Sequence, residues 1–379
     1  MMDNKKIRAI GALVLAIVWA CLTGFSWFGP SQEISLAERR PLEQMPELSL
    51  DSVLDGSFMK DFESYSLDQF PLRDTFRSIK SLFHYYVLNQ RDNNDIYIAD
   101  GSAAQLEYPL SETSLSHAIR RFGYVYEKHL AGSSGEVYMA VVPDKGYYIA
   151  EANGYLAMDY EAMFAALREG MPWANHIDLT DTLSAEDYYR TDTHWRQEKL
   201  LEAAGRLCEA LGVTALTEDD CTPKAVEQPF YGVYYGQAAL PMEPDTLYLM
   251  ESGLLDGCQT YLGELDPKTG LGTYRKLYDG VYDPAGLEGA DLYETYLSGS
   301  QSLIRIENPN AGSDRELILF RDSFGSAIAP LLVKDYAVVT LVDIRYIQPD
   351  MLERFDINWD ADVLLLYSSL VLNNSSTIK

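Results

Sequence analysis

Two short segments of the chain combine residue types that can carry out nucleophilic catalysis. The first is Thr191-Asp192-Thr193-His194-Trp195, in which a carboxylate and an imidazole are two residues apart. In an extended or turn conformation both side chains emerge on one side, so the carboxylate can hold the tautomer of the imidazole and stabilise its protonated form. The segment predicts a general base with an orienting acid. Two structural alternatives stay open at this point: Asp192 or Thr193 as a helix N-cap, and His194 as a histidine packed beside Trp195.

The second segment is Arg321-Asp322-Ser323-Phe324-Gly325, which follows an apolar run predicted to be a buried strand and precedes a predicted helix. A serine at the C-terminal end of such a strand occupies the position of the nucleophile in α/β hydrolases, because the amides of the turn can form an oxyanion hole there. Asp and Ser are also ordinary caps at strand-to-helix junctions, so this segment taken alone favours a capping role.

Together the two segments supply a nucleophile, a base and an orienting acid: Ser323, His194 and Asp192. This combination predicts a catalytic triad that works through an acyl-serine intermediate. A metal site built on Asp192 and His194 has little support, because no second cluster of His, Asp or Glu is visible, and no cofactor is expected. The other histidines lack such neighbours and are expected to be structural or solvated: His84, His117, His129 and His176.

The elements that must position these residues alternate between strands and helices. Buried strands are predicted at 137–142, 316–320, 337–342 and 362–367, with a short strand at 176–179 and a hairpin at 95–101. Helical patterns cover 114–130, 160–168, 196–211 and 326–333. Because each long strand is nearly all apolar, the sequence predicts an α/β sheet covered on both faces. The four long strands are expected to be neighbours, with His194 and Ser323 at their C-terminal edge.

Four segments are expected along the chain. They are a cytoplasmic N-terminus at 1–8, a transmembrane signal anchor at 9–28, a linker with a juxtamembrane helical segment at 29–90, and the α/β domain at 91–379. The helical pattern before the domain is interrupted at Pro71. Within the domain, the span at about 221–300 is rich in Tyr, Gly and Asp and weak in periodicity, so it is expected to be an insertion of loops and short strands.

The anchor is predicted from an uncharged run at 9–28, preceded by Lys5, Lys6 and Arg8. Twenty apolar residues are enough to cross a bilayer core of about 30 Å as a helix. The cations before the run place the N-terminus in the cytoplasm, so we expect a single-pass protein of the cell membrane whose C-terminal domain is extracytoplasmic. Two alternatives are a cleaved signal peptide, for which no small-x-small site follows the run, and a degenerate lipoprotein site at Cys21.

Composition excludes several classes of partner. The chain has 379 residues, with 30 Lys and Arg against 57 Asp and Glu, which gives a formal net charge of −27. A chain this acidic repels phosphate backbones, so nucleic acid is not an expected partner, and neutral ligands fit better than polyanions.

The cysteines agree with export and do not suggest a zinc site. Apart from Cys21 there are only Cys208, Cys221 and Cys258, with neither a CxxC motif nor a Cys/His cluster. A disulfide between Cys208 and Cys221 would close the shortest loop. Three buried free thiols are the alternative, and the sequence does not decide between the two.

The chain resembles the SGNH-hydrolase-like proteins of the DHHW and alginate O-acetyltransferase families. The resemblance rests first on Asp192-Thr193-His194-Trp195 and on the segment that contains Ser323. Further matches lie at Asp61–Tyr65, Asp68–Arg73, Val142–Lys145, Val342–Tyr346 and the last strand at Val363–Tyr367. Together they cover about residues 39–372.

This resemblance implies a three-layer α/β/α domain of circularly permuted order, in which the Asp-x-His pair precedes the serine. It implies that Asp192, His194 and Ser323 form the triad. Characterised relatives move acetyl groups onto or off exported polysaccharide, often beside a membrane-bound O-acyltransferase. The chain departs from the pattern in two places. Thr193 stands where the DHHW motif has a second histidine, and the segment at 297–301 lacks an asparagine for the oxyanion hole.

Two alternative functions are therefore predicted. The first is a membrane-anchored extracytoplasmic O-acetyltransferase or acetylesterase acting on a cell-surface or exported polysaccharide, with a membrane-bound O-acyltransferase as the acetyl supplier. The second is a non-catalytic glycan-binding or assembly protein on the same fold. Tyrosines of the insertion, including Tyr231, Tyr234 and Tyr235, are expected to offer surfaces for stacking on sugars.

Overall fold

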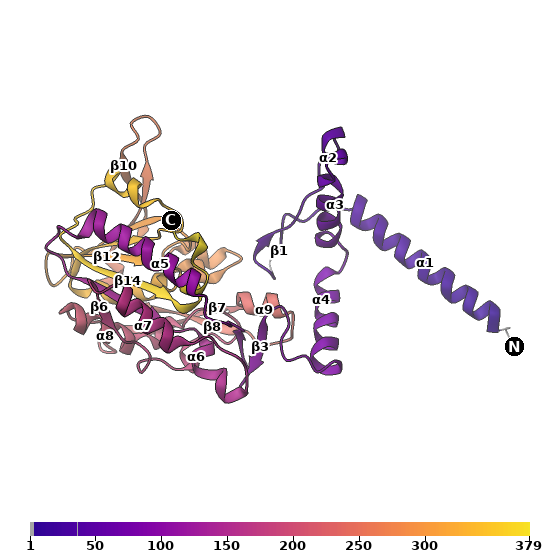
Figure 1. Ribbon diagram of the computed structural model, residues 1–379, viewed down its shortest axis with the longest axis horizontal. Coiled ribbons are helices and arrows are strands. Elements are labelled where there is room, and N and C mark those ends of the chain that lie inside the picture. The colour runs from indigo at the N-terminus through magenta and orange to yellow at the C-terminus, as the bar shows by residue number, and fades with distance from the viewer. Residues whose placement is uncertain (1–3, 36) are drawn as a thin grey trace. The chain divides into compact units, whose positions relative to one another are not determined.

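The computed structural model describes residues 4–35 and 37–379, which divide into two units. The smaller unit comprises residues 1–94 and 235–241, and the larger unit comprises residues 95–234 and 242–379 (Figure 1). Each unit has its own packing and is described separately below.

The larger unit is built on an eight-stranded mixed sheet. In spatial order its strands are β10 (Gly272–Asp279), β9 (Gln259–Leu265), β11 (Leu303–Glu307), β13 (Tyr336–Val342), β12 (Arg315–Arg321), β14 (Asp362–Ser368), β5 (Val137–Val142) and β6 (Asn175–Ile177). The strands from β13 to β6 pair in parallel, and β10, β9 and β11 join one edge in antiparallel pairs. The four long strands predicted from sequence are neighbours in this sheet, as expected.

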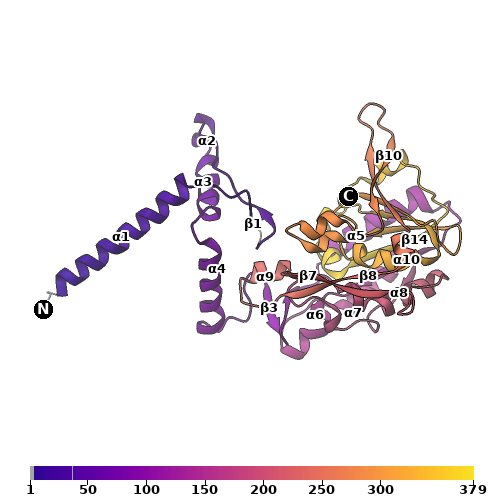
Figure 2. The same cartoon turned by 180° about the vertical axis from the view of Figure 1, so that it is seen from behind.

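Helices cover both faces of the sheet, which explains why the middle residues of its central strands are mostly apolar (Figures 1 and 2). On β12, Leu317 and Leu319 face one core together with α8, and Ile318 and Phe320 face a second core together with α5 and α7. The helices of this unit are α5 (Glu112–Val125), α6 (Lys145–Ile149), α7 (Tyr160–Gly170), α8 (Leu201–Leu211), α10 (Gly253–Asp256), α11 (Phe324–Ile328) and α12 (Ser369–Asn373). The predicted α/β sheet with two covered faces is therefore confirmed.

Two smaller β structures accompany the sheet. The hairpin of β3 (Ile96–Ala99) and β4 (Ser102–Gln105) turns at Asp100 and Gly101, whose φ angles of 50° and 76° are the positive values that an Asp-Gly turn needs. A second antiparallel pair joins β7 (Thr222–Phe230) to β8 (Asp245–Glu251).

The span at 221–300 departs from the expectation of inserted loops and short strands. Two of its strands, β9 and β10, are long and extend the main sheet, and β9 pairs with β11, a strand that the sequence did not predict. Both β9 and β10 mix polar with apolar residues, because this edge of the sheet is partly solvated. The two strands therefore lack the apolar runs of the central strands.

The smaller unit is helical. It contains α1 (Asn4–Phe28), α2 (Leu50–Leu54), α3 (Ser57–Asp68) and α4 (Arg73–Leu82), which continues as a π turn over Phe83–Val87, together with the short pair β1 (Ile34–Ser35) and β2 (Arg40–Pro41). The break between α3 and α4 falls at the predicted Pro71. The helix α9 (Val233–Ala238) starts in the larger unit and ends in the smaller one. Within α1, residues Arg8–Phe28 have a mean hydropathy of 2.1 and are long enough to cross a membrane.

Candidate active site

The structure brings the three sequence-predicted site residues into one hydrogen-bonded chain. The Oγ atom of Ser323 lies 2.7 Å from Nε2 of His194, and Nδ1 of His194 lies 2.5 Å from Oδ1 of Asp192. A carboxylate only accepts hydrogen bonds, so the proton of the neutral ring belongs on Nδ1 and Nε2 accepts from the serine hydroxyl. This is the arrangement in which a histidine takes a proton from a serine nucleophile.

Neither Ser323 nor Asp192 serves as a helix cap through its side chain. Ser323 is the N-cap residue of α11, but its side chain makes no capping hydrogen bond, which leaves the hydroxyl for His194. After His194 the chain continues into a 3₁₀ turn at Gln197–Lys199 whose N-cap is Arg196. Asp192 and Thr193 therefore do not begin a helix, and the capping alternatives do not apply to these residues.

Asp192 is fully buried and held from both sides of its carboxylate. Oδ1 accepts the backbone N–H of His194 at 3.0 Å, and Oδ2 accepts the backbone N–H of Val233 at 2.7 Å. The preceding residue, Gly232, approaches so closely that a Cβ atom there would lie 2.2 Å from Cβ of Asp192. Only glycine fits at this position, and the close approach fixes the carboxylate under the imidazole.

Asp245, at the start of β8, fixes the segment that leads to the triad. Its Oδ2 accepts the backbone N–H and the hydroxyl of Thr191 at 2.8 and 2.6 Å, and its Oδ1 accepts the backbone N–H of Arg190 at 3.0 Å. No local motif marks this residue, because it lies 54 positions after Thr191 in a stretch without periodic pattern.

Tyr293 is the second contributor that the sequence did not reveal. Its ring stacks on the imidazole of His194, with 3.9 Å between centroids and 14° between planes, and its hydroxyl donates to the carbonyl of Ser323 at 3.3 Å. The stacked ring covers one face of the base and limits its rotation. By contrast, Tyr234, expected on a sugar-binding surface, is buried and donates to the Thr193 hydroxyl at 3.0 Å, so its ring is not available for stacking on a glycan.

Asp322 and Arg321, which precede Ser323 in the chain, hold the turn that carries the nucleophile. Asp322 is buried and accepts the backbone N–H groups of Phe324 and Ser368 at 3.0 and 2.7 Å, which ties the turn after β12 to the end of β14. The buried guanidinium of Arg321 donates to the carbonyl groups of Gly299 and Gln301. The segment at 297–301, which lacks the expected asparagine, thus packs its backbone against Arg321.

Lys145 is a buried lysine next to the segment that precedes Asp192. Its ammonium group donates to the carbonyl of Tyr189 at 2.7 Å and lies 5.1 Å from the ring centroid of Tyr234. Burial lowers the pKa of Lys145 to about 7, and the carboxylates of Asp192 and Asp245 act in the opposite direction. The lysine therefore joins the segment before Asp192 to the start of α6, and below about pH 7 its charge offsets those of two buried carboxylates.

We expect the stability of the protein to rise with pH because of Lys145. The unfolded lysine keeps its proton up to about pH 10.5, whereas the folded one releases it near pH 7, so between these values the unfolded state binds more protons and stability increases. At about 1.4 kcal/mol per pKa unit the increase is of the order of a few kcal/mol. Denaturant unfolding of wild type and Lys145→Met across pH 7 to 10 checks this. Parallel curves for the two proteins would contradict it.

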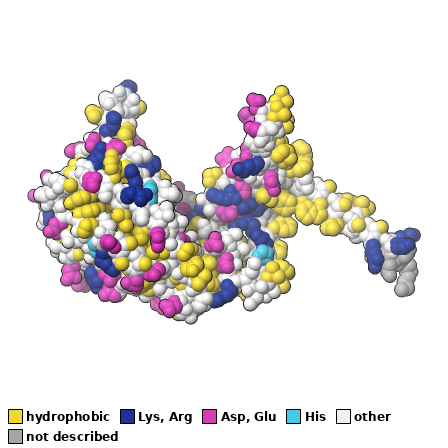
Figure 3. Space-filling model, viewed as in Figure 1, with side chains coloured by type: hydrophobic (Ala, Val, Ile, Leu, Met, Phe, Trp, Pro, Cys, Tyr) yellow, Lys and Arg dark blue, Asp and Glu magenta, His cyan; other side chains and the backbone are white. Residues whose placement is uncertain are grey.

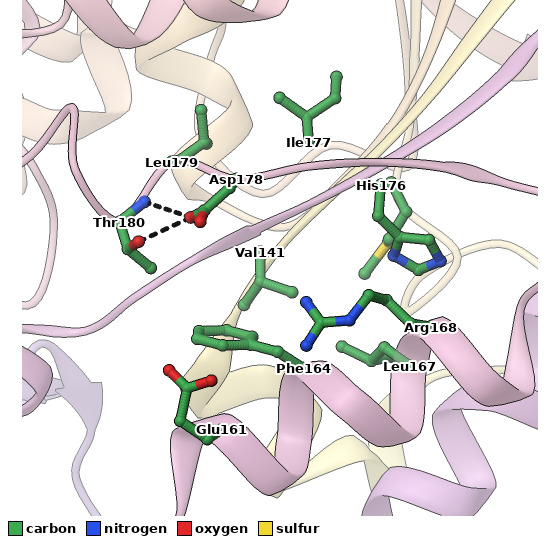
Figure 4. A pocket seen from close by; sticks show the side chains of 11 residues that line it. Val141, Glu161, Phe164, Leu167, Arg168, His176, Ile177, Asp178, Leu179 and Thr180 are labelled. Atoms are coloured by element: carbon green, nitrogen blue, oxygen red, sulfur yellow. Dashed lines mark hydrogen bonds between the residues drawn. The ribbon is translucent and has the colours of Figure 1, made fainter.

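A cavity of about 150 Å³ between α7 and β6 is lined by none of the triad residues (Figure 4). Glu161 and Arg168 of α7 and His176 of β6 line this cavity. The carboxylate of Asp178, which also lines it, accepts hydrogen bonds from the backbone N–H and the hydroxyl of Thr180. Burial lowers the pKa of His176.

No metal or disulfide chemistry is added by the cysteines of the described residues. Cys208, Cys221 and Cys258 are buried free thiols, so the predicted alternative of a Cys208–Cys221 disulfide is not found. Within residues 4–35 and 37–379, no group of three or more His, Cys, Asp or Glu side chains is placed to hold a metal ion.

Comparison with known proteins places the larger unit in a structural group. The family described as DHHW protein matches residues 179–342, a segment that contains Asp192, His194 and Ser323. The crystal structure of a DHHW family protein from Eubacterium siraeum is similar, with 23% identity and a TM-score of 0.60, over 76% of this chain and 95% of that one. No curated protein sequence matches significantly.

Two further solved structures are similar at lower identity. Bacillus cereus PatB1, in a structure with a sulfonyl adduct, has 17% identity and a TM-score of 0.53, over 73% of this chain and 95% of PatB1. The O-acetyltransferase domain of Pseudomonas putida AlgJ has 16% identity and a TM-score of 0.41, over 73% of this chain and 92% of that chain. The larger unit therefore has the SGNH-like α/β/α fold, and the resemblance to the DHHW family is confirmed over residues 179–342.

Proposed function

We propose that the protein is an extracytoplasmic serine O-acetyltransferase or acetylesterase that acts on a cell-surface or exported polysaccharide. The observation that carries the proposal is the hydrogen-bonded chain of Asp192, His194 and Ser323 at the C-terminal edge of the sheet. The resemblance of the segments around Asp192 and Ser323 to those of alginate O-acetyltransferases supports acetyl as the transferred group. The similar PatB1 structure carries a sulfonyl adduct, and activated hydroxyl nucleophiles attack the sulfur of sulfonyl reagents and displace its leaving group.

The reaction proceeds in two steps that use the same residues. In the first, His194 takes the hydroxyl proton as the Ser323 oxygen attacks the acetyl carbonyl, and the departing alcohol receives that proton while the acetyl group stays on the serine. In the second, His194 takes a proton from a sugar hydroxyl or from water as its oxygen attacks the acetyl carbonyl, and returns that proton to the departing Ser323 oxygen, which leaves the acetyl group on the sugar or releases acetate. Asp192 stabilises the imidazolium in both steps.

Location and charge support the choice of acceptor. A helix long and apolar enough to cross a membrane precedes the larger unit, and Lys5 and Arg8 flank its N-terminal end, which by the positive-inside rule favours an extracytoplasmic domain. A formal net charge of −27 disfavours polyanionic acceptors and favours a neutral glycan. An enzyme anchored in the membrane would also be placed to receive acetyl groups from a membrane-bound O-acyltransferase.

The test is acyl labelling at Ser323. Incubation with an activated acetyl ester should release the alcohol in a rapid burst and add one acetyl group to the tryptic peptide that contains Ser323, detected by mass spectrometry. Ser326→Ala is the matched control, because its buried hydroxyl lies on the same helix and has no hydrogen-bond partner in the structure. That variant should label normally.

Three outcomes separate the candidate functions. Labelling followed by transfer to an added neutral oligosaccharide supports acetyltransferase activity, and labelling followed only by release of acetate supports esterase activity. Absence of any label with several acyl donors would reject catalysis. In that case binding of polymer, unchanged in Ser323→Ala, would support the non-catalytic glycan-binding or assembly protein.

A further inference from the structure

One face of the helix α4 and the π turn that follows it is an exposed apolar stripe. The side chains of Phe76, Ile79, Phe83, Tyr86 and Val87 are between 46% and 72% exposed. Their spacings of three, four, three and one place them on one side of a helix. A contiguous apolar face of this length is uncommon on a soluble surface and indicates an interaction site.

The opposite face of the same helix is polar and already engaged. Arg73 and Arg77 form ion pairs with Glu38 at 2.5 and 3.2 Å, and Arg77 also donates to the carbonyl of Gly236. The buried hydroxyl of Ser81 accepts the amide of Asn93 at 2.8 Å. The smaller unit therefore holds α4 by its polar side, and within the described residues the apolar side faces outward.

The stripe is continuous with the surface of α1 near its C-terminal end. The ring of Trp27 lies 5.4 Å from that of Phe62, and the hydroxyl of Tyr65 donates to the carbonyl of Ser26, so α3 is attached to α1. Nearer the middle of α1, Trp19 contacts Phe70 at 6.3 Å. The chain of aromatic contacts then passes from this phenylalanine to the first residue of the stripe, at 5.6 Å.

Figure 3 shows the same division over the whole smaller unit. Hydrophobic side chains gather along the side of α2, α3 and α4 from which α1 extends, whereas Lys, Arg, Asp and Glu side chains gather on the other side. Leu50 and Leu54 of α2 and Met59 of α3 are among the exposed apolar residues of this unit.

We propose that the apolar stripe of α4 and its π turn lies in the interfacial layer of the lipid bilayer that α1 spans. An interfacial helix has a broad apolar face, cations at its edge and aromatic residues with a polar tip, and here Lys80 and Tyr86 provide the last two. The continuity of the stripe with α1 determines the occupant, since a surface joined to the C-terminal half of a membrane span through the contact of Trp19 with Phe70 meets lipid. The inference rests on the proposed membrane anchoring of α1.

The protein then contacts the membrane twice, through one spanning helix and through one helix lying in the outer leaflet. Two lipid contacts restrict the tilt of the smaller unit far more than a single span does, because a single helix is free to tilt and rotate. The interfacial helix thus sets how the segment following residue 94 leaves the membrane surface.

The test uses the full-length protein in nanodiscs of phosphatidylcholine and phosphatidylglycerol. Single cysteines at Ile79 and Phe83, in a Cys21→Ser background, carry an environment-sensitive fluorophore. Cys208, Cys221 and Cys258 stay unlabelled because all three are buried and burial raises the pKa of each thiol. Asp74→Cys is the control, since this residue is 64% exposed and lies on the opposite face of α4.

Quenchers attached to lipid acyl chains should reduce the fluorescence at positions 79 and 83 several-fold more than at position 74, and a water-soluble quencher should show the reverse order. Equal quenching at all three positions by the water-soluble reagent would overturn the inference. A label at Leu15 of α1 tests the anchor separately. Lipid quenching at Leu15 without quenching at 79 and 83 rejects the interfacial helix alone, and no lipid quenching at Leu15 rejects both.

Discussion

Ser323→Ala is expected to lower kcat for acetyl transfer by about 10⁶-fold, the order found when the nucleophile of a serine triad is removed. His194→Ala should cost about as much, because Ser323 and His194 share one hydrogen bond of 2.7 Å and act as a unit. The double variant should be no slower than either single one. Burst kinetics with an activated acetyl ester measure all three, and the burst itself should vanish.

Losses that multiply in the double variant would contradict the acyl-serine route. They would mean that His194 activates water independently of Ser323. Because the serine hydroxyl caps no helix, its removal should leave the unfolding midpoint almost unchanged, which near-ultraviolet circular dichroism and denaturant unfolding verify.

Asp192→Asn is expected to lower kcat by about 10⁴-fold while leaving substrate binding nearly intact. An amide offers its NH₂ group or a weaker acceptor to Nδ1 of His194, so the ring loses the tautomer that leaves Nε2 free for Ser323. The backbone N–H of Val233, now bound to Oδ2, also loses a charged acceptor.

The comparison variant for this prediction is Asp178→Asn. The Asp178 carboxylate also accepts a local backbone N–H, that of Thr180, but it lies in a turn outside the triad. Its activity should match wild type within a few-fold. If both aspartate variants lost activity equally, the effect of Asp192→Asn would be structural rather than a result of the wrong tautomer.

The central part of the fold and the three triad residues were accessible from the sequence because each depends on local signals. Each of the strands β5, β12, β13 and β14 contains a run of mostly apolar residues, since the middle of each strand is buried on both faces, and such runs stand out in any sequence. Ser323 lies where such a strand meets a helix. The Asp-x-His spacing places its two side chains together without help from distant residues.

The residues that complete the site were not accessible, because their contacts are long-range and their local sequence is irregular. Asp245 holds the segment before Asp192 from 54 residues away, and Tyr293 covers His194 from a 3₁₀ turn. Neither position has a period or a motif that marks it. The strands β9 and β10 escaped for a related reason, since one side of that sheet edge is solvated and the apolar signal is correspondingly weak.

The long-range support of Asp192 has a kinetic consequence. The imidazole meets a nucleophile 129 residues later, and the carboxylate beneath it is held by an amide 41 residues later, so the site requires several large loops to close. Helices such as α5 form from near neighbours and reach their structure early, whereas contacts of this sequence separation form slowly. During refolding, the far-ultraviolet dichroism signal should therefore recover well before esterase activity does, and a partly folded chain that already contains its helices remains chemically silent at Ser323.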